Sequence, residues 1–299
     1  MQKTKPTRHT PGGFFYTGFI CYNCFMFNII FGVFTRIFSN TYLNVFQKIL
    51  TNKREKPSVI NFYTYLGLVL VCGLICPQPI FTAEILNNVI IMGILGALGN
   101  YFIIKALSCG ELSCVAPINS YKPVVALILG IILLGELPNI NAICGILLII
   151  FGTFVLSTVK FLFSKAFIFR TLALIFSASE AIFIKKIIIL SNIQSCFLYW
   201  TVAGFLFSLI FVLVSRHKIA IKRENFFTQF VLIILVAIMQ YSTNYVFSEI
   251  NVAYALALFQ LSTILSVIIG VTTFKEGYVL RKLMGASIMA IGAVCIILA

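Results

Sequence analysis

Long apolar runs follow one another along almost the whole chain, and they constrain its fold more than any other feature. About 20 apolar residues are enough to cross about 30 Å of hydrocarbon as an α-helix. Because a bilayer offers the backbone no hydrogen-bond partners, helices are the expected structure for such segments. The sequence therefore predicts an all-α integral membrane protein with ten transmembrane helices, at approximately residues 27–49, 60–77, 87–107, 114–134, 140–159, 167–190, 196–215, 226–247, 251–272 and 283–299.

The composition excludes several other classes of protein. Charged residues make up 10% of the chain, whereas a soluble protein has about 25%, so no soluble domain is expected. The net charge of +14 does not indicate a nucleic-acid partner, because the basic residues lie in short connections, where topology signals occur. There is no aspartate, and both histidines, His9 and His217, lie outside the apolar runs. We therefore expect no catalytic residue, no metal site and no cofactor, and the lipid bilayer as the main partner.

The two halves of the chain share a pattern. A shift of 140 residues aligns Glu136 with Glu276, and it aligns Gly130, Gly145 and Gly152 with Gly270, Gly285 and Gly292. This similarity predicts two five-helix repeats, residues 27–160 and 161–299, after an N-terminal extension at 1–26. Because five is odd, the second repeat must enter the membrane from the opposite side. The repeats are therefore expected to be inverted, an arrangement that places a binding site near the bilayer midplane.

The repeat also resembles a known family. Residues 105–156, KALSCGELSCVAPINSYKPVVALILGIILLGELPNINAICGILLIIFGTFVL, are similar to the first repeat of EamA-like members of the drug/metabolite transporter superfamily. There, a proline-containing helix ends in Leu-Gly-Glu and is followed by a glycine-rich helix. Residues 261–297 resemble the second repeat, with Lys-Glu in place of Gly-Glu. The resemblance implies a ten-helix carrier of small molecules.

Membrane orientation has two conflicting indicators. Lysine and arginine are concentrated in the connections near 53–56, 160–170, 216–223 and 275–282, and the opposite connections carry neither. The positive-inside rule places these basic connections in the cytoplasm and both termini outside. The family resemblance instead implies that both termini are inside. We give the charge distribution slightly more weight.

Small residues at helical spacing are expected to be packing sites. Ala126 and Gly130 lie four residues apart, as do their counterparts Ser266 and Gly270. Such spacing lets helix backbones approach closely in lipid. The same role is expected for two glycine pairs seven residues apart, Gly145/Gly152 and Gly285/Gly292. Glu136 and Glu276 fall at helix ends and are interpreted as structural residues of the turns.

Two charged residues inside the predicted spans are candidates for function. Lys122 would cost about 2.5–3.5 kcal/mol at the bilayer centre, so it should face the bundle interior or water. Pro117 and Pro123 free backbone carbonyls near it. Lys122 is therefore a candidate anchor for a carboxylate or phosphate, the alternative being a purely structural pairing. Glu180 is the only acid deep within a span.

The family resemblance adds a role for Glu180. Small multidrug transporters, in the same superfamily, carry one glutamate in their first helix for proton and substrate exchange. Glu180 lies in the first helix of the second repeat, so the resemblance implies proton coupling at this residue. The alternative is a permanent ion pair with Lys122 or another cation.

Further polar residues are predicted to line a central cavity, or else to form hydrogen bonds between helices. Within 226–247, Gln240 and Asn244 are four residues apart and Tyr245 lies beside them, while Asn100 aligns with Gln240. In 27–49, Asn44 belongs to a similar stripe. These side chains cannot face lipid cheaply. The substrate-binding candidates are therefore Lys122, Asn100, Gln240, Asn244, Tyr245 and Asn44.

These features predict a secondary transporter rather than an enzyme. It would move a small metabolite, such as an amino acid, or a drug-like compound across the plasma or inner membrane by alternating access. Protons or the substrate gradient would drive it. The alternative is a membrane-embedded structural or receptor subunit that transports nothing. The sequence leaves open whether the protein is a monomer or a homodimer.

The charge distribution generates a first prediction. A reporter that is active only in the cytoplasm, fused after Ala299, should be inactive, because the charge rule places the C-terminus outside. An active fusion would support the orientation implied by the family resemblance instead. The same reporter inserted in the 53–56 connection is the positive control.

Overall fold

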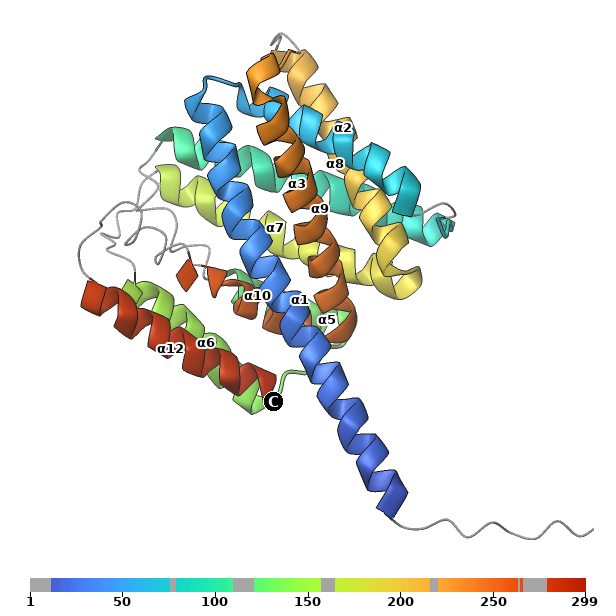
Figure 1. Ribbon diagram of the computed structural model, residues 1–299, viewed down its shortest axis with the longest axis vertical. Helices are drawn as coiled ribbons and strands as arrows, with labels where there is room; N and C mark the ends of the chain where they lie inside the picture. Colours follow the sequence, from blue (N-terminus) through green and yellow to red (C-terminus); the bar gives the residue numbers. More distant parts are fainter. Residues whose placement is uncertain are drawn as a thin grey trace, which may run out of the picture.

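The computed structural model describes residues 12–75, 79–109, 121–156, 165–215, 220–262, 264–265 and 279–299. These residues form helices and no β-strand (Figure 1). The helices are α1 (Gly12–Asn52), α2 (Pro57–Ile75), α3 (Ala83–Cys109), α5 (Lys122–Leu134), α6 (Ile140–Leu156), α7 (Lys165–Leu190), α8 (Ile193–Ser215), the 3-10 helix η2 (Arg223–Asn225), α9 (Phe226–Glu249), α10 (Val252–Phe259) and α12 (Val279–Ile297).

The all-helical prediction is confirmed, and each predicted span overlaps a helix. By length and composition, three segments of the described residues could cross a membrane, Ala83–Asn100, Ile193–Ser215 and Arg223–Glu249. Four shorter apolar helices accompany them, at Ser58–Gly73, Lys122–Leu134, Ile140–Val155 and Met284–Ile297. The number of crossings and the inverted relation of the two halves stay predictions. Ser266, Gly270 and Glu276 lie outside the described residues.

The helices pack in pairs that join the first half of the chain to the second. The most extensive packing is between α6 and α12, α3 and α7, α1 and α9, and α2 and α8 (Figure 1). Helix α5 lies against α7 and α10. The α6–α12 pair forms one edge of the bundle, and the remaining helices surround the interior (Figure 1). A bundle of this kind brings side chains from distant parts of the sequence together at its centre.

Glycines let α6 and α12 approach closely. A Cβ atom on Gly145 would lie 2.6 Å from the carbonyl oxygen of Gly292, and one on Gly152 would lie 2.8 Å from that of Gly285. These pairings mean that the two helices run antiparallel with backbone against backbone. The four glycines of the two pairs predicted at seven-residue spacing therefore all lie in one contact. On α5, Ala126 and Gly130 are also buried.

Most hydroxyl groups in the helices are satisfied by their own helix. Thr41, Thr64, Thr153, Thr201 and Thr243 each donate to the carbonyl oxygen four residues earlier, at 2.7–3.0 Å. This local bonding makes serine and threonine inexpensive inside a membrane. These polar residues thus give little information about function, and the charged and amide side chains give more.

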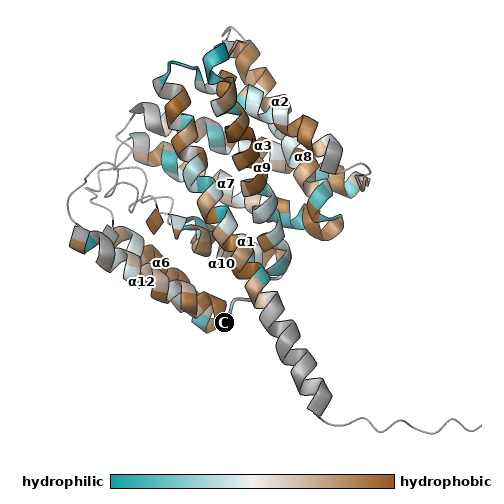
Figure 2. Cartoon of the chain, viewed as in Figure 1, coloured by the Kyte–Doolittle hydropathy of each residue, from teal (hydrophilic) through white to brown (hydrophobic). Residues whose placement is uncertain are grey.

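One end of the bundle is rich in hydrophilic residues, which gather at the connection between α1 and α2 and at η2 (Figure 2). There Glu55 accepts hydrogen bonds from the Lys222 backbone at 3.1 Å and from the Asn225 side chain at 2.7 Å. We call this end, which carries residues 53–56 and 222–225, the basic end. The helices between the two ends are predominantly hydrophobic (Figure 2).

Glu136 connects the turn after α5 to α7 and α10 at the other end of the bundle. We call this end the opposite end. Helix α5 ends at Leu134 and is capped by Gly135, whose φ of 68° is left-handed and suits glycine. The Glu136 carboxylate pairs with Lys185 of α7 at 2.7 Å and accepts a hydrogen bond from the Val252 backbone at 3.2 Å. Lys185 also donates to the carbonyl of Ile250 at 2.8 Å. Glu136 therefore lies in the turn, as expected, but its contacts are with α7 and α10.

The glycine contact generates a second prediction. Gly145→Ala should lower the thermal unfolding temperature of the purified protein, because its new methyl group meets the backbone of α12 at Gly292 and Ile296 as well as the Ile296 side chain, and the backbone cannot move aside easily. Overpacking of this kind costs about 1–3 kcal/mol. The matched control is Gly73→Ala, since a Cβ atom there meets nothing within 4 Å. Equal unfolding temperatures for both variants would contradict this packing.

Candidate functional site

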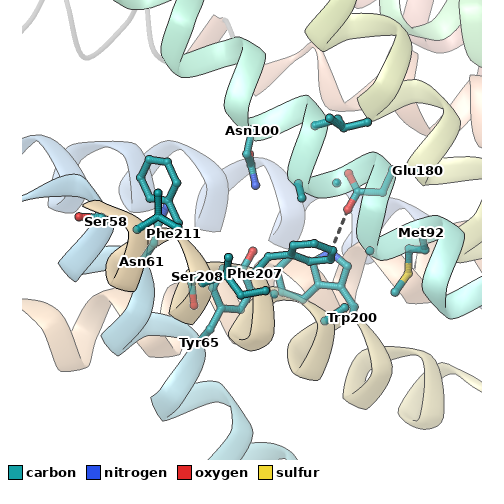
Figure 3. A pocket seen from close by; sticks show the side chains of 18 residues that line it. Ser58, Asn61, Tyr65, Met92, Asn100, Glu180, Trp200, Phe207, Ser208 and Phe211 are labelled. Carbon is teal, nitrogen blue, oxygen red and sulfur yellow. Dashed lines mark hydrogen bonds between the residues drawn. The ribbon is translucent and has the colours of Figure 1, made fainter. Parts of the chain in front are cut away.

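A cavity of about 530 Å³ lies at the centre of the bundle. Its walls come from both halves of the chain, and its polar lining includes Arg36, Asn100, Lys122, Glu180 and Gln240. A second hollow of about 320 Å³ shares the residues Asn61, Tyr65, Asn100, Glu180 and Trp200 with it, so the two adjoin (Figure 3). Together they have the size and mixed lining of a small-molecule site.

Glu180 lies where the two hollows meet. It belongs to the middle part of α7, and its carboxylate accepts a hydrogen bond of 3.3 Å from the indole nitrogen of Trp200 (Figure 3). A Cβ atom on Gly96 of α3 would lie 2.7 Å from the same carboxylate oxygen. Gly96 thus makes room for the Glu180 side chain in the contact between α3 and α7.

Trp200 also contacts helix α2. Its ring packs against Tyr65 of α2, with 5.3 Å between ring centroids, and Gly204, one turn along α8, leaves space for the Tyr65 ring. Trp200, Tyr65 and Glu180 therefore form a connected group contributed by three helices. An aromatic wall beside a carboxylate can bind both an apolar body and a polar group of a ligand.

Lys122 and Arg36 supply positive charge to the same cavity. Lys122 opens α5, a helix of 13 residues. At 1.5 Å per residue it lies about 18 Å from the C-terminal end of α5, well inside the bundle. Lys122 is within electrostatic range of Glu180, but among the described residues the ion pair that forms is Lys185–Glu136. The expected alternative, a structural pair of Lys122 with Glu180, is therefore not formed as a direct contact.

Arg36 comes from α1, and its guanidinium lies over the Phe259 ring, 4.9 Å from the centroid. Its Nε atom is buried and has no hydrogen-bond partner in the part of the chain that the structure describes. A buried, unpaired donor is costly. Arg36 thus offers an unused hydrogen-bond donor beside the cavity.

The other predicted binding residues divide into three groups. Asn100 and Gln240 line the cavity. Asn244 is buried behind Gln240 and accepts its side-chain hydrogen bond at 2.9 Å, so it positions Gln240. Tyr245 lies elsewhere, in a separate hollow between α1 and α9 that includes Gly32. The side chain of Asn44 lies outside the described part, and its backbone belongs to α1.

Sequence reasoning missed Arg36, Tyr65, Trp200 and Gly96 as parts of the site. Two of these residues have a feature in the sequence that could have indicated their role. Arg36 is a cation within the predicted span 27–49, and Trp200 is the single tryptophan of the chain. Tyr65 and Gly96 have no such feature, because their roles depend on how helices pack. No group of three or more metal-ligating residues occurs among the described residues.

The cavity reaches the two ends of the bundle unequally. The adjoining hollow of about 320 Å³ is lined by Ser58 at the start of α2 and by Phe211 and Val214 near the end of α8, so this hollow extends from the cavity toward the basic end. Toward the opposite end, Lys185 of the Glu136–Lys185 pair directly follows the lining residue Ile184, and Val252, which is bonded to Glu136, lies one turn before the lining residue Leu256. There Ile80 also bonds Ser195 and Tyr199 at the start of α8.

Comparison with known proteins identifies the first half of the chain. Residues 26–158 match the EamA-like transporter family. For these residues, the resemblance to EamA-like members of the drug/metabolite transporter superfamily is confirmed; the resemblance of residues 261–297 stays a prediction. The family is one of membrane transporters of small substrates. No curated protein matches the chain.

Solved structures show that the fold extends further. One, described as a crystal structure of a protein, has a TM-score of 0.73 to this chain at 15% sequence identity. The similarity covers 89% of this chain and 95% of that one. At this identity the likeness concerns the fold alone, and it includes the half that the family match leaves out.

The contact between Trp200 and Glu180 generates a third prediction. Because Trp200 is the single tryptophan, the intrinsic tryptophan fluorescence of the protein reports on this site alone. Glu180→Leu should shift the emission to shorter wavelength, since it removes the hydrogen-bond acceptor and the charge beside the indole. Glu224→Leu, at an exposed position of η2, is the matched control and should leave the spectrum unchanged. Identical spectra for all three proteins would contradict the contact.

Proposed function

We propose that this chain, whose residues 26–158 match the EamA-like transporter family, is a secondary transporter that moves a small metabolite or drug-like compound. The observation that carries the proposal is the charged cavity at the centre of an apolar helical bundle. Charged side chains in a membrane cost free energy, and they usually mark the path of a substrate or ion. The protein would be a multi-pass protein of the plasma or inner membrane.

The packing of the helices supports an inverted-repeat architecture. If α1, α2, α3, α5 and α6 correspond in order to α7, α8, α9, α10 and α12, each main contact has a counterpart. The α3–α7 contact then corresponds to α9–α1, and α5–α7 corresponds to α10–α1, while α2–α8 and α6–α12 map onto themselves. This is the pattern expected from a two-fold relation between units 27–160 and 161–299, which the family match, ending at 158, also favours.

The unequal ends of the cavity support alternating access. In the proposed cycle, the protein described here is the state open toward the basic end. The Glu136–Lys185 pair and the bonds of Ile80 close the opposite end, and they would separate when the substrate leaves on that side. Because the interior is lined by both repeats, a rocking of one against the other would exchange the two states.

Glu180 is the proposed proton-coupling residue. Its carboxylate is the acidic group among the described residues that line the cavity, and it is within electrostatic range of the cation Lys122. A proton on Glu180 would remove its attraction for Lys122 and change the charge that the substrate meets. Binding of protons and substrate would therefore be linked, as coupled transport requires.

A flux assay generates the fourth prediction. Proteoliposomes containing the protein should accumulate a labelled metabolite from a mixed pool when a pH gradient is imposed. Glu180→Gln should keep exchange of substrate across the membrane but lose its dependence on the gradient. Glu224→Gln is the matched control. If no member of a broad panel of metabolites moved, and Lys122, Glu180 and Gln240 variants behaved like the wild type in cells, the transport proposal would fall.

A further inference from the structure

We infer that the central cavity selects a small organic oxyanion, a carboxylate or a phosphate ester, whose charged group binds between Arg36 and Lys122. The inference rests on the proposed transport function and names its substrate class. It begins with the charge of the cavity. Among the described residues, two cationic side chains and one anionic side chain line it, so one of these positive charges has no counter-charge within the described lining.

Additional positive charge lies close by. Arg170 of α7 is within electrostatic range of Lys122, and its Nε atom, like that of Arg36, is buried without a hydrogen-bond partner in the described part of the chain. Among the described residues, Lys122 therefore has two further cations, Arg36 and Arg170, and one carboxylate, Glu180, within electrostatic range. Inside a low-dielectric bundle, a negatively charged ligand relieves the repulsion among these cations.

Glu180 does not serve as the direct partner of either cation. Its carboxylate is bonded to Trp200 and packed against α3 at Gly96, and it forms no ion pair with Lys122 or Arg36 among the described residues. This arrangement keeps the carboxylate on the α3–α8 side of the cavity. The two cations thus retain capacity for a second anionic group.

Arg36 is arranged to receive such a group. Its guanidinium is held over the Phe259 ring instead of being paired with a carboxylate. Arginine binds carboxylate and phosphate oxygens through charge-assisted hydrogen bonds, which are among the strongest in proteins. An oxyanion here would give the guanidinium, whose Nε is buried and unpaired in the described part of the chain, a partner of opposite charge.

The remaining walls indicate the rest of the ligand. Tyr65, Trp200 and Phe247 line the cavity together with several aliphatic residues. A cavity of about 530 Å³ accommodates a metabolite-sized molecule but no polymer. The geometry therefore fits a compact molecule that has an oxyanion at one end and an apolar or aromatic body.

The test uses the full-length protein in detergent micelles and four probes with one body. These are cyclohexanecarboxylate, cyclohexyl phosphate, cyclohexanecarboxamide and cyclohexylmethylammonium, and Trp200 fluorescence measures their binding. One or both oxyanion probes should bind at least about tenfold more tightly than the neutral and cationic ones, as expected for hydrogen bonds to charged groups. The stronger of the two identifies whether carboxylate or phosphate is preferred.

Variants of the cationic residues test whether their charge is needed for oxyanion binding, apart from any effect on folding. Arg36→Met and Lys122→Met should each weaken oxyanion binding by about tenfold or more, and Lys122→Arg should retain most of it. Lys53→Met removes an exposed cation of the α1–α2 connection and should change nothing. Unfolding temperature and gel-filtration profile are measured for each variant, and only folded proteins are compared.

Three results would overturn the inference. In the first, the ammonium probe binds more tightly than the oxyanion probes, and Glu180→Gln abolishes that binding. In the second, Arg36→Met and Lys122→Met leave oxyanion binding unchanged. In the third, the folded wild type binds neither oxyanion probe. Flux measured in parallel keeps the two proposals apart. Transport without preference for anions would refute only the substrate class, whereas oxyanion binding without any flux would refute only the transport function.

Discussion

The cost of placing charge inside a hydrophobic bundle is the constraint on which the rest of the structure depends. Four charged side chains, Arg36, Lys122, Arg170 and Glu180, lie among helices made mostly of apolar residues. In hydrocarbon such groups must be paired, solvated or supplied with a ligand. The described residues pair them only in part, through Trp200 and Phe259. The cavity at the centre of the bundle gives three of these groups, Arg36, Lys122 and Glu180, access to water or a ligand as a partner.

The packing around the cavity follows from small residues at helix contacts. Gly145 and Gly292 bring α6 and α12 together at one edge, and Gly96 lets the Glu180 side chain lie against α3. In lipid, association of helices relies on close packing rather than on the hydrophobic effect. The glycines therefore set the distances between helices, and the distances determine which side chains can meet in the interior.

The sequence predicts the helices well because the apolar runs are long. The seven-residue spacing of its glycines matches the contact between α6 and α12. The sequence places Lys122, Glu180, Asn100 and Gln240 in one cavity, since polar groups there have few other places to go. The sequence groups Tyr245 with Gln240 as lining of one cavity. Successive residues of a helix are rotated by about 100°, so Tyr245, one residue after Asn244, lies in the hollow next to α1 instead. The sequence also cannot pair Glu136 with Lys185, because that contact depends on how α5, α7 and α10 pack.

Whether the charged centre of the bundle is accessible from water is the most direct test of this account. Trp200, the single tryptophan, lines the cavity, so its quenching can be compared from the two phases in liposomes. The account predicts that acrylamide, dissolved in water, quenches Trp200 strongly, and that lipids brominated near the middle of their chains quench it weakly. Strong quenching by the brominated lipids together with protection from acrylamide would contradict a water-filled site and the transport function built on it.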